Sequence, residues 1–183
     1  MVKGLISEKK LLYKIQTRKD PDAFGKLYDL YIEKIYRFIF LKLSHKQEAE
    51  DVTSEVFLKA WHYLIDPSKD SVKHFSGLVY KIARNSVIDV YRKRSNTKEF
   101  SLEDSDSIVS DDALAQIEQK HDVQIILKSL HKLKSQYQEL IVFRYVDELS
   151  ISEIAEILDK KPTAVRVGLH RAIKTLKNIV QYE

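Results

Sequence analysis

The chain has 183 residues, of which 44% are hydrophobic, and its 31 Lys and Arg against 27 Asp and Glu give a formal net charge of +4. That apolar content is enough for packed cores and argues against wholesale disorder. The lack of cysteine excludes disulfides and thiolate metal sites, while only 4 Gly and 3 Pro favour helices over a turn-rich sheet.

The first segment, residues 1–19, is charged throughout. It contains no apolar stretch long enough for a signal peptide, and no run of about 20 apolar residues occurs anywhere in the chain. We therefore expect a soluble, cytoplasmic protein without membrane insertion, in which residues 1–19 form an N-terminal extension.

A first helical module is predicted over residues 20–95. Asp20 and Pro21 open it, because Asp caps helix starts and Pro is tolerated at the first helical position. Apolar residues recur at helical spacing as far as Ile39 and, after a break at residues 43–45, from Ala49 to Ala60. Residues 65–74 are typical of a loop, and residues 75–94 predict a further helix.

Ser, Asp and Glu dominate residues 96–112, where the helical periodicity fades, so this stretch predicts an acidic flexible linker. Periodic helices resume in a second module over residues 113–183. Two capping-box patterns occur there, Ser135 with Gln138 and Ser150 with Glu153. No strand alternation is found, and the predicted fold class is all-α.

The end of the second module has the pattern of a helix-turn-helix, with a short helix over residues 150–158, a turn at 159–161 and a longer helix over 162–180. Such geometry sets the second helix into the DNA major groove. A helical hairpin with a solvated basic face is the alternative, but no acid occurs in this last helix before Glu183. Gly168, which costs about 1 kcal/mol relative to Ala in a helix, indicates a close backbone approach.

The last helix of the first module combines aromatic and basic residues. Exposed aromatics stack on unpaired bases and Arg contacts phosphate, so the pattern favours binding of single strands. The alternative is that the aromatics belong to the core and the cations are solvated, which holds for Leu78 and Ile82 and in part for Tyr80 and Tyr91. For Arg84, Asn85 and the run from Arg92 to Arg94 we favour nucleic acid.

Several stretches in a fixed order resemble the extracytoplasmic-function (ECF) sigma factors of RNA polymerase. The family's region two is similar to residues 20–38, to residues 49–61 (AEDVTSEVFLKAW) and to residues 80–94 (YKIARNSVIDVYRKR), whereas residues 133–176 resemble region four. The resemblance implies a factor, not an enzyme, that directs core polymerase to promoters and helps to melt the −10 region. It also implies an anti-sigma partner and no cofactor or metal.

The resemblance carries site residues over position by position. Contact with the clamp of core polymerase is implied for Asp51, Glu55 and Phe57. Contact with the −10 element, whose flipped base would be held by residues 65–74, is implied for Tyr80, Lys81, Arg84, Asn85, Arg92 and Arg94. Contact with the −35 element is implied for Thr163, Arg166, Val167, His170, Arg171 and Lys174.

Two other functions compete with this interpretation of the sequence. A dimeric helix-turn-helix repressor accounts for the second module but leaves the basic aromatic helix of the first unexplained. An enzyme is disfavoured, because Glu118 and His121 form only one of the paired motifs that a di-iron site needs. Glu50, Asp51 and Glu55 lack a nearby partner in sequence for acid–base catalysis, and there is no Gly-rich phosphate loop.

Overall fold

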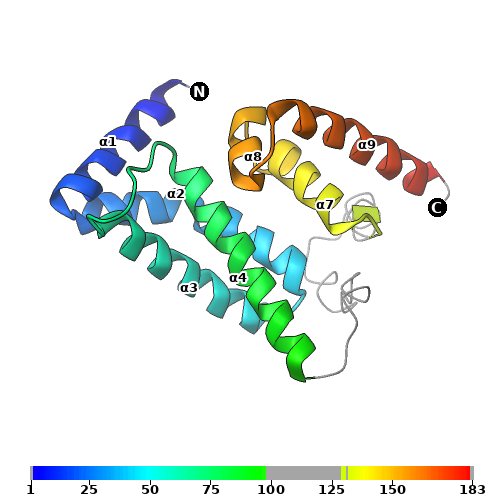
Figure 1. Ribbon diagram of the computed structural model, residues 1–183, viewed down its shortest axis with the longest axis horizontal. Helices are drawn as coiled ribbons and strands as arrows, with labels where there is room; N and C mark the ends of the chain where they lie inside the picture. Colours follow the sequence, from blue (N-terminus) through cyan, green and yellow to red (C-terminus); the bar gives the residue numbers. More distant parts are fainter. Residues whose placement is uncertain (1, 98–128, 131, 182–183) are drawn as a thin grey trace.

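The computed structural model describes residues 2–97, 129–130 and 132–181. In these ranges every regular element is helical, which confirms the predicted class (Figure 1). The elements are α1 (Val2–Arg18), α2 (Pro21–Leu43), α3 (Lys46–Ile65), α4 (Phe75–Thr97), α7 (Ser135–Ile141), the π-helical turn η1 (Val142–Val146), α8 (Ile151–Leu158) and α9 (Pro162–Gln181). Most of the expected linker, together with Glu118 and His121, lies outside the described residues.

Helix α2 begins and ends where the sequence predicts. The Asp20 carboxylate accepts hydrogen bonds from the backbone N–H groups of Asp22 and Ala23, at 3.0 and 3.1 Å, and Pro21 is the first helical residue. At the other end Ser44 adopts a left-handed conformation with φ of 53°. Its N–H bonds the Phe40 carbonyl oxygen, so the chain reverses at the predicted break and enters α3.

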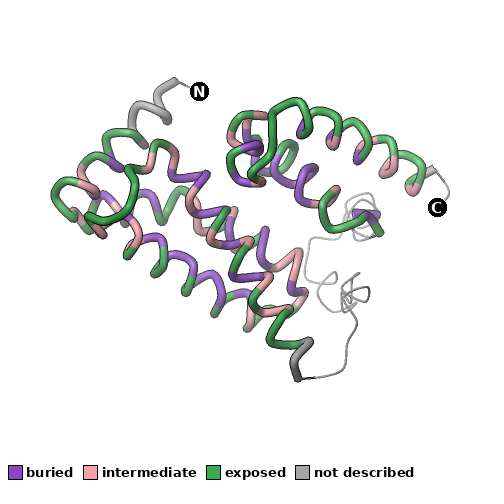
Figure 2. Tube along the Cα trace, viewed as in Figure 1, coloured by how far each residue is buried: buried purple, intermediate pink, exposed green. Residues whose placement is uncertain are grey.

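Helices α1 to α4 form the first module, and their buried faces meet in one apolar core. Figure 2 shows the buried residues along the sides of α2, α3 and α4 that face one another. The segment that was expected to be an extension contributes to this core through α1. Leu11, Leu12 and Ile15 of α1 are at most 8% exposed, and α1 contacts both α2 and α3.

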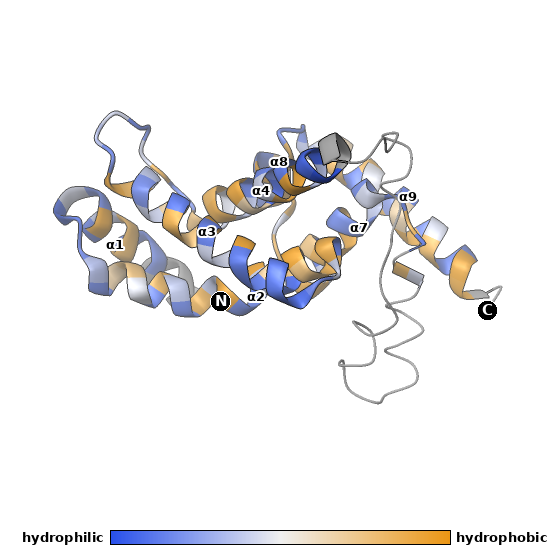
Figure 3. Ribbon diagram, turned by 90° about the horizontal axis from the view of Figure 1, so that it is seen from below, coloured by the Kyte–Doolittle hydropathy of each residue, from blue (hydrophilic) through white to orange (hydrophobic). Residues whose placement is uncertain are grey.

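The second module contains the predicted helix-turn-helix, α8 and α9. Ser150 and Glu153 form the predicted capping box, in which the Ser150 hydroxyl accepts from the Glu153 N–H and the Glu153 carboxylate accepts from the Ser150 N–H. Hydrophilic and hydrophobic residues alternate along α9, as expected of a helix with one apolar face (Figure 3). The other predicted capping box is wrong: α7 begins after Lys134 without a side-chain cap.

The π-helical turn between α7 and α8 could not be predicted from periodicity. The Asp147 N–H bonds the Val142 carbonyl oxygen at 2.9 Å, and the Leu149 N–H bonds that of Phe143 at 2.8 Å. The wider turn leaves Phe143 and Asp147 at most 3% exposed. Turns of this kind are frequent where a helix serves a function besides packing.

The two modules are packed on each other, with α8 against α4 (Figure 1). A single apolar cluster runs through both and includes Phe38 and Tyr80 of the first module and Phe143 and Ile154 of the second. Among the described helices, none combines the length and the apolar character that crossing a bilayer requires.

Candidate nucleic-acid interface

The outer face of α9 presents the residues predicted to contact the −35 element. All six are exposed: Thr163, Arg166, Val167, His170, Arg171 and Lys174. The inner face carries Val165, Leu169 and Ala172, which are at most 6% exposed and anchor the helix on α7 and α8. The outer face is therefore free to bind, and its cations form no ion pair with another residue in the described part of the chain.

Gly168 lies on the inner side of α9. A Cβ at this position would come within 2.8 Å of the Leu140 Cδ1 on α7. The close backbone approach that the sequence indicated is thus an approach to α7, and it fixes the position of α9 on α7. Val167, 51% exposed, is an apolar side chain on the outer face and suits contact with a thymine methyl group.

The residues of α4 that were predicted to contact the −10 element fall into two groups. Lys81, Asn85, Arg92 and Arg94 are exposed. No hydrogen bond joins the Asn85 side chain to another described residue, whereas Arg94 forms an ion pair with Glu48 at the start of α3.

Tyr80 belongs to the second group, because it is completely buried. Its ring meets Phe38 and Phe143 edge to face, with centroid distances of 5.8 and 5.2 Å. Burial raises the pKa of its hydroxyl, with a further contribution from the neighbouring Asp147 carboxylate. In this arrangement of the modules Tyr80 is a core residue and is not accessible for stacking on a base.

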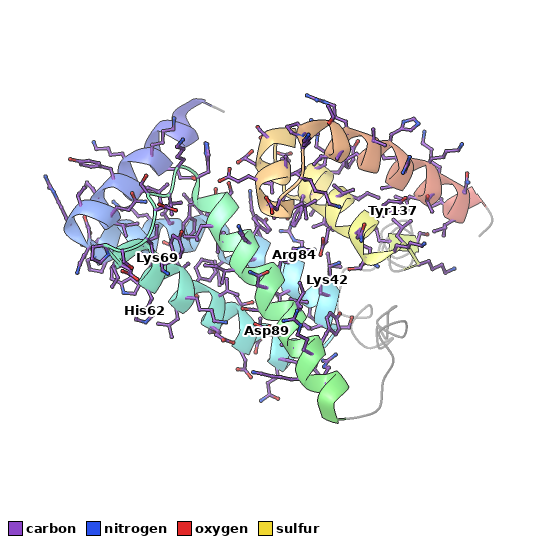
Figure 4. All side chains as sticks on the ribbon, viewed as in Figure 1. Lys42, His62, Lys69, Arg84, Asp89 and Tyr137 are labelled. Atoms are coloured by element: carbon purple, nitrogen blue, oxygen red, sulfur yellow. The ribbon has the colours of Figure 1, made fainter. Side chains whose placement is uncertain are left out.

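Arg84 also faces the second module, where the Glu139 side chain of α7 lies between two cations of the first. The Arg84 Nε lies 3.4 Å from Glu139 Oε2, and the Lys42 Nζ lies 3.6 Å from Oε1. Figure 4 shows Arg84 and Lys42 on α4 and α2, at the side of the first module nearest α7. The Lys42 and Glu139 side chains are 7% and 9% exposed. Burial lowers the pKa of Lys42, and the Glu139 carboxylate opposes that effect.

A second polar contact joins the start of α4 to α8. The Ser76 hydroxyl donates to Glu153 Oε1 at 3.0 Å. Burial alone would raise the pKa of Glu153, but the hydrogen bonds from Ser150 and Ser76 lower it below its usual value. One residue further along α4, a Cβ on Gly77 would lie 3.2 Å from the Glu156 carboxylate, so the end of the Glu156 side chain of α8 lies against this turn of α4.

Asp147 lies at the contact between the two modules, where its carboxylate lacks well-formed hydrogen bonds. Neither of its carboxylate oxygens, nor the Tyr80 hydroxyl, makes a hydrogen bond of normal geometry to a described residue. Its partner is Arg37 of α2, whose guanidinium lies 3.7 Å away. Burial raises the pKa of Asp147, while Tyr80 and Arg37 act in the opposite direction.

The residues predicted to contact core polymerase are also divided. Asp51 and Glu55 are exposed on α3, and Glu55 pairs with Lys59 at 2.7 Å. Phe57, in contrast, is 3% exposed and packs against the Tyr28 ring, with centroids 4.7 Å apart. The sequence patterns did not indicate the exposed apolar side chains of α2 and α3, which are Tyr28, Leu30 and Leu58, at 38%, 56% and 57% exposed. A protein partner can cover such side chains.

The loop predicted to hold the flipped base occupies residues 66–74, between the end of α3 and the start of α4. Its first part is ordered by Asp66, whose Oδ1 accepts from the N–H and the hydroxyl of Ser68 at 2.9 and 2.7 Å. Its second part is held by side chains of α1. The sequence offered no sign of this contact, because the two segments lie far apart along the chain.

Comparison with known proteins agrees with this geometry. The family model of sigma-70 region 2 matches residues 27–97, and that of sigma-70 region 4 matches residues 124–176. The chain is 32% identical over 176 residues to the ECF RNA polymerase sigma factor SigW of Bacillus subtilis, covering 88% of this chain and 91% of SigW. It is 28% identical over 163 residues to the RNA polymerase sigma factor YlaC of the same organism, covering 87% and 92% of the two chains.

Solved structures share the fold. CnrH, in complex with the cytosolic domain of CnrY, superposes with a TM-score of 0.74 at 20% identity, covering 97% of this chain and 99% of CnrH. The sigma factor RpoE, in complex with the anti-sigma factor NepR from Bartonella quintana, gives a TM-score of 0.65 at 21% identity, with coverage of 86% and 96%. With both sigma-70 regions matched in order and SigW aligned over nearly its whole length, the chain belongs to the ECF RNA polymerase sigma factors.

Proposed function

We propose that this sigma factor binds core RNA polymerase through the outer faces of α2 and α3, reads the −35 element with α9 and opens the −10 element with α4 and residues 66–74. The observation that carries the proposal is the presence of two separate basic helices, α9 and α4, in one chain of this family. One suits the major groove of a duplex and the other suits a melted strand.

At the −35 element the work is divided among neighbouring side chains of α9. Arg166 and Arg171 are long, exposed and able to pair bidentately with a guanine edge. Lys174 lies further along the helix and neutralises phosphate, which adds affinity without sequence preference.

At the −10 element the exposed part of α4 meets the separated strand. Asn85 has both a donor and an acceptor available for a base edge, and Arg92 supplies positive charge one to two turns further along. A base must leave its stack before a pocket can hold it, at a cost of a few kcal/mol, and these contacts offset that cost.

Promoter opening requires the two modules to separate. Arg84 is paired with Glu139, Ser76 with Glu153, and Tyr80 is buried beneath Phe143, so α7, η1 and α8 cover one side of α4. This arrangement is therefore a closed form, and we expect it to make promoter binding by the free protein weak. Because RpoE was solved with an anti-sigma factor, we propose that a partner of this class controls the present chain as well.

The test is run-off transcription with the purified chain and core polymerase, followed by mapping of start sites. We expect discrete starts only when both components are present, and gel shifts of promoter DNA only when core is added. Specific binding of a palindromic site by the free chain as a dimer would contradict the proposal and favour the repressor.

A further inference from the structure

Helix α1 contacts the loop that is proposed to hold the flipped base. Its apolar side is anchored in the core by Leu11, Leu12 and Ile15. Two polar side chains, Glu8 and Gln16, then reach the segment that connects α3 to α4. They lie about two turns apart on α1, so the helix sets the spacing of the two contacts.

Glu8 holds the start of α4. Its Oε1 accepts a hydrogen bond from the Phe75 backbone N–H at 2.8 Å, and its Oε2 accepts one from the Tyr31 hydroxyl, also at 2.8 Å. Phe75 is the first residue of α4, where backbone N–H groups have no partner within the helix. A carboxylate at the N-terminal end of a helix also interacts favourably with the helix dipole. Glu8 thus acts as a cap supplied by another helix.

Gln16 holds the loop just before α4. Its Nε2 donates to the Val72 carbonyl oxygen at 3.2 Å. Together with Glu8 it fixes residues 72 to 75 on one side, while the Asp66 turn orders the beginning of the loop on the other. Residues 69–71, which are all exposed, therefore connect two parts of the loop that are held by hydrogen bonds.

We propose that Glu8 and Gln16 are positioning residues that hold residues 66–74 in the shape that receives the flipped base of the −10 element. This inference rests on the proposed function, because it assigns the role to a loop that is proposed to read DNA. A preformed loop binds the extruded base without first ordering itself, so loss of either contact weakens base reading and leaves other contacts of the protein unchanged.

The experiment compares Glu8→Ala, Gln16→Ala and their combination with the unaltered chain, each assembled with core polymerase. Open complexes are measured by permanganate reactivity on promoters that carry single-base changes across the −10 element. We expect the double variant to form open complexes about tenfold less well and to lose preference at one −10 position. Core affinity and −35 preference should remain as in the unaltered chain, and the melting temperature should fall only by the few degrees that loss of a helix cap causes.

Matched controls separate positioning from folding. Glu8→Gln keeps an oxygen for the Phe75 N–H and should restore most of the preference, and Lys9→Ala on the exposed side of α1 should have no effect. A uniform loss of core binding, −35 preference and thermal stability, or an unchanged −10 preference, would overturn the assignment. If the unaltered chain itself showed no −10 preference with core, the proposed function would fail instead.

Discussion

Glu139 shows how one side chain links the two DNA-reading modules. It is buried with Lys42, while the partly exposed Arg84 lies beside its other carboxylate oxygen, so two of these three charged groups have little access to water. A buried charge that loses its partner costs several kcal/mol, whereas the intact group is close to neutral for stability. The pairing therefore adds little net stability to the closed form, but it makes the form specific, because only the correct seating of α7 satisfies Lys42.

The first prediction at the scale of single residues concerns Arg166. Arg166→Ala should cost about 1–3 kcal/mol at one or two base pairs of the −35 element and relax the preference there, because a bidentate contact to a base edge is lost. Binding is measured with holoenzyme on a set of −35 variants. Lys174→Ala is the control, and it should weaken all sequences alike and flatten the salt dependence. Unchanged promoter choice in Arg166→Ala would mean that another face of α9 reads DNA.

The second prediction concerns Asn85. Because its side chain is exposed and makes no hydrogen bond to a described residue, Asn85→Ala should leave the melting temperature and core affinity unchanged. It should nevertheless impair opening of the −10 region, and a promoter with a pre-melted bubble should recover part of the loss, since unstacking is already done. Permanganate footprints measure both. Normal footprints on duplex DNA would rule out a role for Asn85 in opening.

At the scale of helices, the two glycines within α2 and α9 have different surroundings. A Cβ on Gly25 would meet nothing within 4 Å, but one on Gly168 would lie 2.8 Å from Leu140, a residue that is 5% exposed. Gly25→Ala should therefore raise the free energy of unfolding by about 1 kcal/mol through helix propensity alone. Gly168→Ala should give less than this gain or a loss, because Leu140 has to move within a packed core. Thermal unfolding of both variants measures the difference. Equal gains in the free energy of unfolding would show that Leu140 on α7 moves aside without cost.

The ends of the helices could be predicted from the sequence better than the contacts between helices could. Local signals marked the start of α2 at Asp20, the break before α3 and the capping box of α8, because each depends on residues within one turn of one another. The same reasoning failed for Ser135, whose hydroxyl accepts from Lys42 at 2.8 Å and leaves α7 uncapped. That contact spans 93 residues of sequence, and no local pattern encodes it.

The site residues divide in the same way. The exposed cations of α9 follow from helical periodicity, since the apolar positions face α7 and α8. In α4 periodicity could not show that Tyr80 and Arg84 face the second module, because this helix packs against α2 and α3 and also against α8, and the apolar pattern does not tell these partners apart. For Gly168 the sequence indicated a close approach but not whether DNA or α7 makes it.

At the scale of the whole molecule, the closed form combines apolar stabilisation with a polar cost. Phe38, Tyr80 and Phe143 form a continuous aromatic contact across the modules, with Phe38 and Phe143 stacked at 5.2 Å. Against this, Asp147 and the Tyr80 hydroxyl are buried without normal hydrogen bonds, and an unsatisfied buried polar group costs about 1–3 kcal/mol. Opening returns these groups to water, so a partner that binds only the separated modules can shift the equilibrium with modest differential affinity.

The last prediction tests this opening with a reversible cross-link, which is practical because the chain has no cysteine. The Glu156 side chain of α8 reaches the place of a Cβ on Gly77, with its Cδ 3.2 Å away, so we choose the pair Gly77→Cys and Glu156→Cys to join α4 to α8 by a disulfide when the modules are closed. Non-reducing gels should show the cross-linked chain after mild oxidation. With core polymerase the oxidised protein should fail to open promoters, and reduction should restore transcription. Each single variant, oxidised in the same way, should remain active. A cross-linked chain that opens promoters as well as its reduced form would show that α4 can act while α8 stays against it, and separation of the modules would then not be required.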